Sequence, residues 1–149
     1  MKALRKALFL FILLLLMGFP LKSLVISQSG HSQVFILGDK WLRIQYNHSV
    51  EHSEVIEIIE ANRRGMFVRE MLWGDFGAGL PEDIQGLKDG YYYKKIDQPL
   101  GDSLDYWFIP FNRPEIIVDN ETVIVPRTPG LVHLKIKTCP VILVLIGRC

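Results

Sequence analysis

The fold is constrained most by a succession of short apolar or alternating runs, which turn residues interrupt about every 8 to 12 positions. In the run 41–47, apolar and polar side chains alternate with the period of a half-buried β-strand. Regularly spaced short strands are typical of sandwiches and barrels. The sequence therefore predicts an all-β domain, either a single small β-sandwich or a partly open barrel.

The candidate strands are 33–37, 41–47, 54–61, 66–73, 91–96, 106–109, 115–118, 122–125, 131–137 and 141–146. Asn62-Arg63-Arg64-Gly65 and Asp119-Asn120 are typical of hairpin turns. The segment 74–90 contains five glycines and one proline, so we expect a loop there. The last run, VILVLI, is apolar throughout and is interpreted as a strand covered on both sides.

A basic, leucine-rich segment precedes the strand pattern. Lys2, Arg5 and Lys6 come before an uncharged run over 7–21, as in chains that are exported across a membrane. We interpret 1–27 as a signal peptide or a signal-anchor helix, 28–32 as a polar spacer and 33–149 as the extracytoplasmic domain. Cleavage before Gln28 would release the domain, whereas a helix extended to Ile26 would be about 30 Å long and could cross the bilayer.

The charge distribution supports export and argues against nucleic acid as a partner. Three basic residues before the apolar run and one after it predict a cytoplasmic amino terminus with the domain outside. The protein would then be a single-pass cell-membrane protein, or a secreted or periplasmic protein after cleavage. The whole chain has a net charge of +1, and without its leader 13 basic residues face 16 acidic ones. Such a mildly acidic domain lacks the electrostatic footprint of a nucleic-acid binder.

Two cysteines, Cys139 and Cys149, lie near the carboxyl end. An oxidising compartment would allow them to pair. A strand over 141–146 would hold them about 20 Å apart, so the tail would have to fold back for a disulfide to form. The sequence leaves their pairing open.

His48-Ser49-Val50-Glu51-His52 matches the H-x-x-E-H pattern of inverted zinc metalloproteases. That chemistry requires a helix, which would place both histidines on one face with Glu51 beside a zinc-bound water. Five β-branched residues between Val50 and Ile59 favour a strand instead. A small metal-dependent or hydrolytic enzyme that uses His48 and Glu51 remains the alternative hypothesis. Adjacent strand residues point to opposite faces, which argues against His48 as a base for Ser49.

The second motif is Asp75-Phe76-Gly77-Ala78-Gly79-Leu80-Pro81. Closely spaced glycines can turn backbone N–H groups towards an anion or a carbonyl, but the spacing is not a dinucleotide fingerprint. The alternative is a tight corner in which Phe76 and Leu80 fill the core. The aromatic groups 91–93 and 106–108 could stack on a sugar or a base, although half of each would face the core.

Tyr46-x-His48-Ser49-Val50-Glu51 together with Phe76-Gly77-Ala78-Gly79-Leu80-Pro81, behind an apolar amino-terminal segment, resembles the uncharacterised family numbered 1850 among domains of unknown function. The resemblance extends from about Val34 to the end. It implies a small exported or membrane-tethered domain that accompanies TAXI-type TRAP solute transporters. The implied partners are the transporter permease or its solute-binding protein.

The resemblance assigns no catalytic residue, so none is predicted, and no metal or cofactor is expected. Enzymatic activity stays open, with a non-enzymatic accessory role favoured. The candidate binding residues share the two motifs and are His48, Ser49, Glu51, Asp75, Phe76, Gly77, Gly79 and Pro81.

Overall fold

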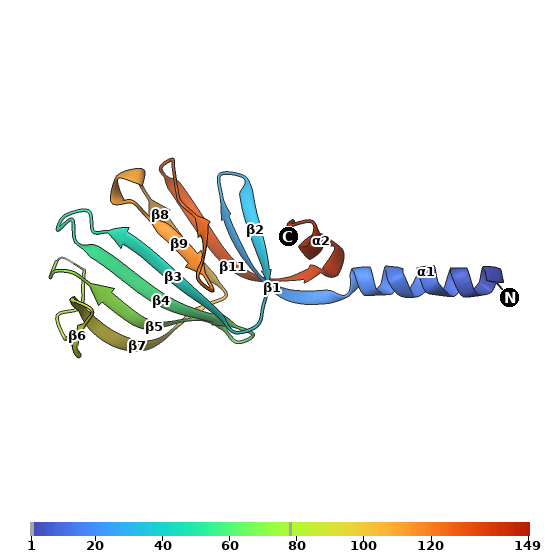
Figure 1. Ribbon diagram of the computed structural model, residues 1–149, viewed down its shortest axis with the longest axis horizontal. Coiled ribbons are helices and arrows are strands. Elements are labelled where there is room, and N and C mark those ends of the chain that lie inside the picture. The colour runs from blue at the N-terminus through green and yellow to red at the C-terminus, as the bar shows by residue number, and fades with distance from the viewer. Residues whose placement is uncertain (1, 78) are drawn as a thin grey trace.

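A computed structural model describes residues 2–77 and 79–149, which form two antiparallel β-sheets (Figure 1). The first sheet consists of β1 (Pro20–Gln28), β2 (His31–Ile36), β8 (Ser103–Phe108) and β11 (Gly130–Pro140), in the order β2-β1-β11-β8. The second consists of β3 (Lys40–Asn47), β4 (Glu54–Asn62), β5 (Gly65–Trp73), β6 (Gly86–Lys88), β7 (Tyr91–Gly101), β9 (Glu115–Val118) and β10 (Glu121–Ile124), in the order β10-β9-β3-β4-β5-β7-β6. The helices are α1 (Lys2–Gly18), the 3-10 turn η1 (Pro110–Asn112) and α2 (Val141–Leu145).

The predicted all-β fold with an amino-terminal helix is confirmed, and neither sheet closes into a barrel. Both sheets contribute fully buried side chains to one hydrophobic core. Burying such side chains is the main favourable contribution to folding. The core residues at most 1% exposed include Leu24, Ile26, Leu42, Ile44, Ile59, Ile116, Val132 and Leu134.

Both predicted hairpin turns are present. Asp119 and Asn120 have φ of 47° and 70°, the left-handed pair that a tight two-residue turn requires. Between β4 and β5, Gly65 has φ of 131° and lies so close to Gly101 that a Cβ would come within 3.2 Å of the Gly101 carbonyl oxygen. A side chain at Gly65 would therefore strain the backbone and crowd the next strand.

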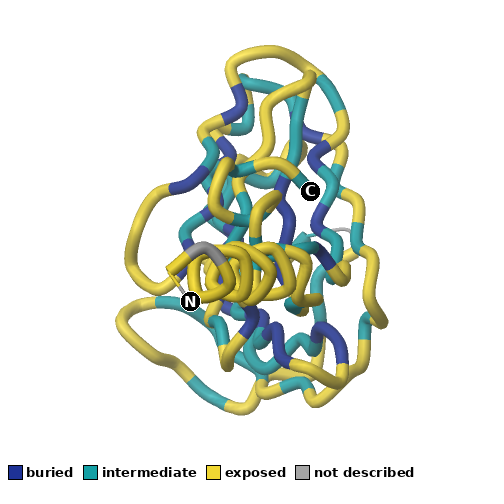
Figure 2. Tube along the Cα trace, turned by 90° about the vertical axis from the view of Figure 1, so that its right-hand side faces the viewer, coloured by how far each residue is buried: buried dark blue, intermediate teal, exposed yellow. Residues whose placement is uncertain are grey.

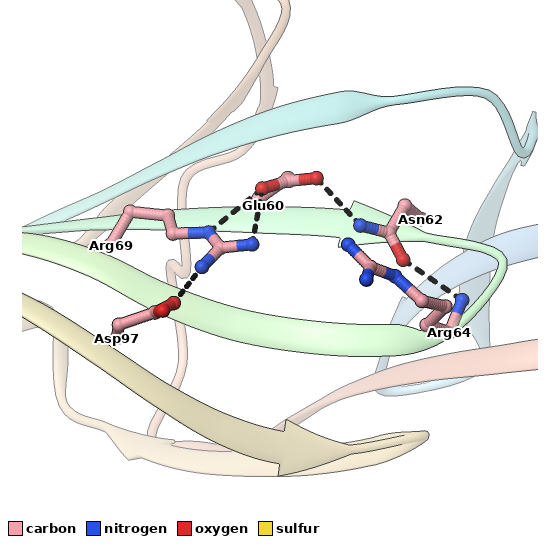
Figure 3. A network of polar contacts seen from close by, with 5 residues as sticks. All are labelled: Glu60, Asn62, Arg64, Arg69 and Asp97. Atoms are coloured by element: carbon pink, nitrogen blue, oxygen red, sulfur yellow. Dashed lines mark hydrogen bonds and ion pairs between the residues drawn. The ribbon is translucent and has the colours of Figure 1, made fainter.

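A polar network on the β4–β5 hairpin links it to β7 (Figure 3). The Glu60 carboxylate accepts hydrogen bonds from Asn62 at 2.6 Å and from Arg69 Nε at 2.8 Å. The Asn62 hydrogen bond and the Arg69 guanidinium together lower the pKa of Glu60. Arg69 also forms an ion pair with Asp97, and the Asn62 side chain accepts the Arg64 N–H at 2.8 Å. The network fixes the register of three neighbouring strands.

The amino-terminal segment differs from its prediction. The helix ends at Gly18, and Pro20–Gln28 forms β1, which pairs with β2 on one side and β11 on the other. The helix extended to Ile26 is therefore wrong, and the folded domain begins at Pro20 rather than at residue 33. Most of the expected polar spacer belongs to β1 and β2, with a turn at Ser29-Gly30. Leu24, Val25 and Ile26 are consecutive and all buried, so both faces of β1 are covered there and its sequence continues the apolar run of the helix.

The carboxyl end also differs from its prediction. Residues 141–145 form α2 rather than a strand, and Cys139 and Cys149 form a disulfide with their Cα atoms 5.9 Å apart. The Val141 N–H donates a 3.0 Å hydrogen bond to the Phe19 carbonyl, which places α2 beside the end of α1 (Figure 1). Periodicity does not distinguish strand from helix in so short an apolar run.

The disulfide closes a short loop and should stabilise the carboxyl end. We expect Cys149→Ser to lower the free energy of unfolding by about 2–3 kcal/mol, because a crosslink of this span restricts the unfolded chain. Urea unfolding of the oxidised full chain in detergent measures this loss. Arg148→Ser, at the exposed neighbouring position, is the control. Equal unfolding midpoints for Cys149→Ser and the wild type would contradict the prediction.

Helix α1 projects from the sheets (Figure 1), and nearly all of its described residues are exposed (Figure 2). The leucine, isoleucine and phenylalanine residues between Leu4 and Leu16 are 38–75% exposed. Within residues 2–77 and 79–149, no helix combines the length and the apolarity that a membrane crossing needs.

The strand connections gather at two opposite ends of the domain. The end next to α1, called here the helix pole, carries the turns at 37–39, 62–65 and 119–120. The other end, the loop pole, carries the connections 48–53, 74–85 and 109–114. Figure 1 shows the β3–β4 connection far from α1. A strand as long as β4 separates the two poles by about 30 Å.

Candidate functional site

The first motif forms a tight turn between β3 and β4. The His48 N–H donates to the Ser53 carbonyl at 2.8 Å, and the His52 N–H donates to the His48 carbonyl at 3.0 Å. The Glu51 N–H approaches His48 Nδ1 at 3.4 Å, and His52 adopts φ of 54°. The turn presents Ser49 and Glu51 at the surface. Because no helix forms here, the spacing required for a helical zinc-protease motif is absent.

The second motif forms a loop that leaves β5 at the same pole. The Gly74 N–H donates to the Glu54 carbonyl at 2.9 Å, and the Asp75 carboxylate accepts the Phe76 N–H at 2.8 Å. Phe76 is 42% exposed, and its ring centroid lies 4.4 Å from that of Tyr92. The alternative in which Phe76 fills the core is therefore wrong. Its ring instead lies partly exposed against an aromatic neighbour.

The two motifs meet at the loop pole. Glu51 packs directly on Gly77, and a Cβ added to Gly77 would overlap with Glu51 Cγ. A Cβ on Gly74 would likewise touch Ser53 Cβ at 3.4 Å. The β4–β5 register explains this meeting, because Val55 pairs with Trp73 and so brings the flanking segments together. A side chain at position 77 would therefore displace the Glu51 side chain, whereas the backbone angles of Gly77 do not demand glycine.

The structure places the remaining predicted residues less centrally. Gly79 is exposed with φ of 85°, Pro81 is half-buried, and Ala78 lies outside the described residues. Asp75 is exposed and caps its own loop backbone. We therefore define the loop-pole patch as His48, Ser49, Glu51, Phe76 and Gly77.

Sequence reasoning missed one aromatic neighbour of the 48–53 turn and two buried polar atoms at the loop pole. Phe111 of η1 lies 5.9 Å from the His52 ring, measured between ring centroids. Ser53 Oγ and Trp73 Nε1 are buried without a hydrogen-bond partner among the described residues. Phe111 arrives through the β8–β9 connection, so no local pattern marks it. Tyr92, singled out with its neighbours as a stacking candidate, packs against Phe76 with an angle of 42° between the ring planes.

Tyr46 of the first motif points inward rather than into the patch. Its hydroxyl donates a 3.0 Å hydrogen bond to Glu57, and the Tyr106 hydroxyl donates a 2.6 Å hydrogen bond to the other Glu57 oxygen. Burial raises the pKa of both tyrosines, and the Glu57 carboxylate raises it further. Because Glu57 is on the seven-stranded sheet and Tyr106 on the four-stranded sheet, this cluster links the two sheets.

The described residues contain no group of three His, Cys, Asp or Glu side chains that could hold a metal ion. The patch combines one carboxylate, one imidazole, one hydroxyl and an exposed aromatic ring. Exposed aromatic rings with a few adjacent polar groups are typical of protein-binding surfaces.

A family model described as a domain of unknown function, DUF1850, matches residues 42–124, which is more than half of the chain. The chain belongs to this family. No curated protein and no solved structure matches it. The DUF1850 match begins later and ends earlier than the resemblance in the sequence, which extended from Val34 to the end.

The boundaries of the DUF1850 match follow the architecture. They include the seven-stranded sheet from Leu42 onward, strand β8 and both motifs of the loop pole. Strands β1, β2 and β11 and both α-helices lie outside the match. The matched segment therefore contains the whole loop-pole patch. The unmatched strands β1, β2 and β11 form most of the four-stranded sheet, and β1 directly follows α1.

Proposed function

We propose that this DUF1850 protein is a membrane-tethered, extracytoplasmic and non-enzymatic domain that assists a TAXI-type TRAP solute transporter. Helix α1 holds it in the cell membrane with the amino terminus on the cytoplasmic side. The loop-pole patch contacts the transporter permease or its solute-binding protein. The observation that carries the proposal is the placement of α1 and the patch at opposite poles of the domain.

The exposed side chains of α1 support the tether. Among the described elements only α2 lies beside the helix, near its end, so most leucines and phenylalanines of α1 would face water in a soluble protein. Exposed apolar patches of this size mark contacts with a membrane or another protein. Lys2, Arg5 and Lys6 at the start of α1 match the basic excess of cytoplasmic flanks.

The short connection between α1 and the sheet supports the outward orientation of the patch. Only Phe19 separates α1 from β1, and β1 is the second strand of its sheet. A tether this short holds the helix pole at the membrane surface. The patch then lies about 30 Å out, where a soluble binding protein or the outer face of a permease can reach it.

Photo-crosslinking tests the contact. The full chain is produced with the TAXI-type binding protein and the TRAP permease of the same genome, and a photoreactive phenylalanine replaces Phe76. We expect a crosslink to one of these two proteins. The control places the same group at Trp107, which is 66% exposed on β8. Crosslinks to neither transporter protein, or equal crosslinks from both positions, would contradict the proposal.

Substitutions in the patch give the matching functional test. We expect His48→Ala and Glu51→Ala each to weaken capture of the crosslinked partner about tenfold, the effect of losing about 1.4 kcal/mol of binding free energy. Gly77→Ala should act in the same direction, because its Cβ displaces the Glu51 side chain. Gly38→Ala is the control, since nothing lies within 4 Å of a Cβ there. Wild-type capture and solute uptake by all three patch variants would exclude the patch as the contact.

A further inference from the structure

The helix pole carries a second apolar surface next to α1. Helix α2 and the residue that follows it expose four aliphatic side chains: Ile142 at 43%, Leu143 at 37%, Leu145 at 66% and Ile146 at 56%. Phe19, between α1 and β1, is 57% exposed. These residues and the exposed side chains of α1 lie at the same end of the molecule, because α2 is hydrogen-bonded at the base of α1.

The position of α2 is fixed by three attachments. The Val141 N–H is hydrogen-bonded to the Phe19 carbonyl, so the first turn of α2 is held at the base of α1. The Cys139–Cys149 disulfide closes the segment on itself. The Ser32 hydroxyl donates to the Gly147 carbonyl at 3.4 Å and links the end of the segment to β2. These attachments hold α2 at the helix pole, beside the end of α1.

The uncharged portion of α1 is shorter than a bilayer is thick, which gives a physical reason for a second membrane contact. Its uncharged portion, from Ala7 to Phe19, is about 20 Å long, against about 30 Å for the hydrocarbon core of a bilayer. A short segment is accommodated when the bilayer thins or when flanking groups sink into it. If α1 inserts, the helix pole is therefore drawn against the headgroups.

Exposed basic residues near this surface suit a lipid interface. Lys22 lies near the start of β1, three residues after Phe19. Its ammonium group donates a 3.0 Å hydrogen bond to the Arg63 carbonyl. Arg63 and Arg148 are both exposed. Basic side chains that flank an apolar face are the usual composition of segments that lie in the headgroup region.

We propose that α2 is a second membrane-contact element, which inserts its aliphatic side chains into the headgroup boundary beside α1. The inference rests on the proposed tether and extends it. With two attachment points, the domain cannot swing freely about Phe19. The loop-pole patch is consequently held at a fixed height and orientation above the membrane.

Depth-dependent fluorescence quenching tests the contact. The full chain is reconstituted into vesicles of phosphatidylcholine and phosphatidylglycerol whose acyl chains carry bromine, a tryptophan quencher. Leu145→Trp places a reporter on α2, and Ile142→Trp is a second reporter on the same helix. Leu87→Trp is the control, because Leu87 is 69% exposed on β6 at the loop pole. The three native tryptophans are present in every variant, so each reporter is measured as its difference from the wild type.

We expect quenching of the two α2 reporters to exceed that of Leu87→Trp at least about threefold, because an interfacial helix lies about 5–10 Å deep in the headgroup boundary. Vesicle flotation separates the two proposals. If the wild-type chain floats with the vesicles and the α2 reporters resemble the control, α2 lies in water and this inference is overturned while the tether stands. If the wild-type chain does not float, the tether itself fails and the inference fails with it.

Discussion

Leu24→Ala and Ile26→Ala should each lower the free energy of unfolding by about 2–5 kcal/mol, because both remove a fully buried side chain from the shared core. Leu24 pairs with Ile136 of β11 and Phe35 of β2, so its loss leaves a cavity between three strands. If residues 20–28 belonged to a leader outside the folded domain, the same substitutions would leave the free energy of unfolding unchanged. Urea unfolding of the full chain in detergent measures the loss.

Leu10→Ala is the matched control. Leu10 is 57% exposed on α1, so its substitution should change the free energy of unfolding by less than about 0.5 kcal/mol. The contrast separates α1, which lies outside the folded domain, from β1, which belongs to it. If Leu24→Ala and Ile26→Ala unfolded at the wild-type urea concentration, β1 would not be part of the sheet.

The role of β1 bears directly on whether the leader is cleaved. Cleavage before Gln28 would remove nearly all of β1 and would leave β2 and β11 without the strand that joins them. Unpaired strand edges and an exposed core would follow. Cleavage before Gln28 is therefore inconsistent with the four-stranded sheet.

The sequence predicted most strands because their side chains alternate. The run over 41–47 and the turn at Asp119-Asn120 carry the information for β3 and for the β9–β10 hairpin within a few residues. The failures are the two apolar runs. In Leu24-Val25-Ile26 and in VILVLI every side chain is apolar, so periodicity is absent and neighbouring elements decide between strand and helix.

The candidate site could be predicted in part for a similar reason. The hairpin at Asn62–Gly65 fixes which residues of β4 and β5 face each other, and its register carries Ser53 to Gly74 and Glu51 to Gly77. The contact between the two motifs can therefore be predicted from the residues of this one turn, which set the register of the two strands. The approach of Phe111 to His52 and of Tyr106 to Glu57 depends on how β8 packs against the other sheet, which no local pattern encodes.

Glu57→Ala should lower the free energy of unfolding by about 2–6 kcal/mol. Glu57 faces the core between Ile44 and Met71, and its two carboxylate oxygens accept the hydroxyl hydrogen bonds of Tyr46 and Tyr106. Removing the carboxylate leaves two largely desolvated hydroxyl groups without their acceptor, at about 1–3 kcal/mol for each such group. Urea unfolding at neutral pH measures the loss.

Glu57→Gln and Tyr91→Phe provide the controls. Glutamine keeps one acceptor oxygen for a tyrosine hydroxyl, so its loss should be smaller than that of alanine. Tyr91 donates to Glu54 at the rim of the seven-stranded sheet, outside the contact between the sheets. Its substitution by phenylalanine should cost less than about 1 kcal/mol. If Glu57→Ala cost no more than Tyr91→Phe, the cluster would not hold the two sheets together.

The same cluster predicts a loss of stability in alkaline solution. Burial, reinforced by the Glu57 carboxylate, raises the pKa of Tyr46 and of Tyr106 above the ordinary tyrosine value. The folded protein therefore keeps both protons at a pH at which the unfolded chain releases them. Stability is full below about pH 10, the value for an unfolded tyrosine, and falls as the pH rises above it.

The double variant Tyr46→Phe/Tyr106→Phe separates this effect from general alkaline unfolding. It should be less stable than the wild type at pH 8, because the Glu57 carboxylate loses both donors. Its stability should then decline less between pH 9 and pH 11, since neither position can ionise. Parallel urea-unfolding curves for the two proteins across that interval would show that other groups govern alkaline unfolding, and that the Glu57 cluster does not.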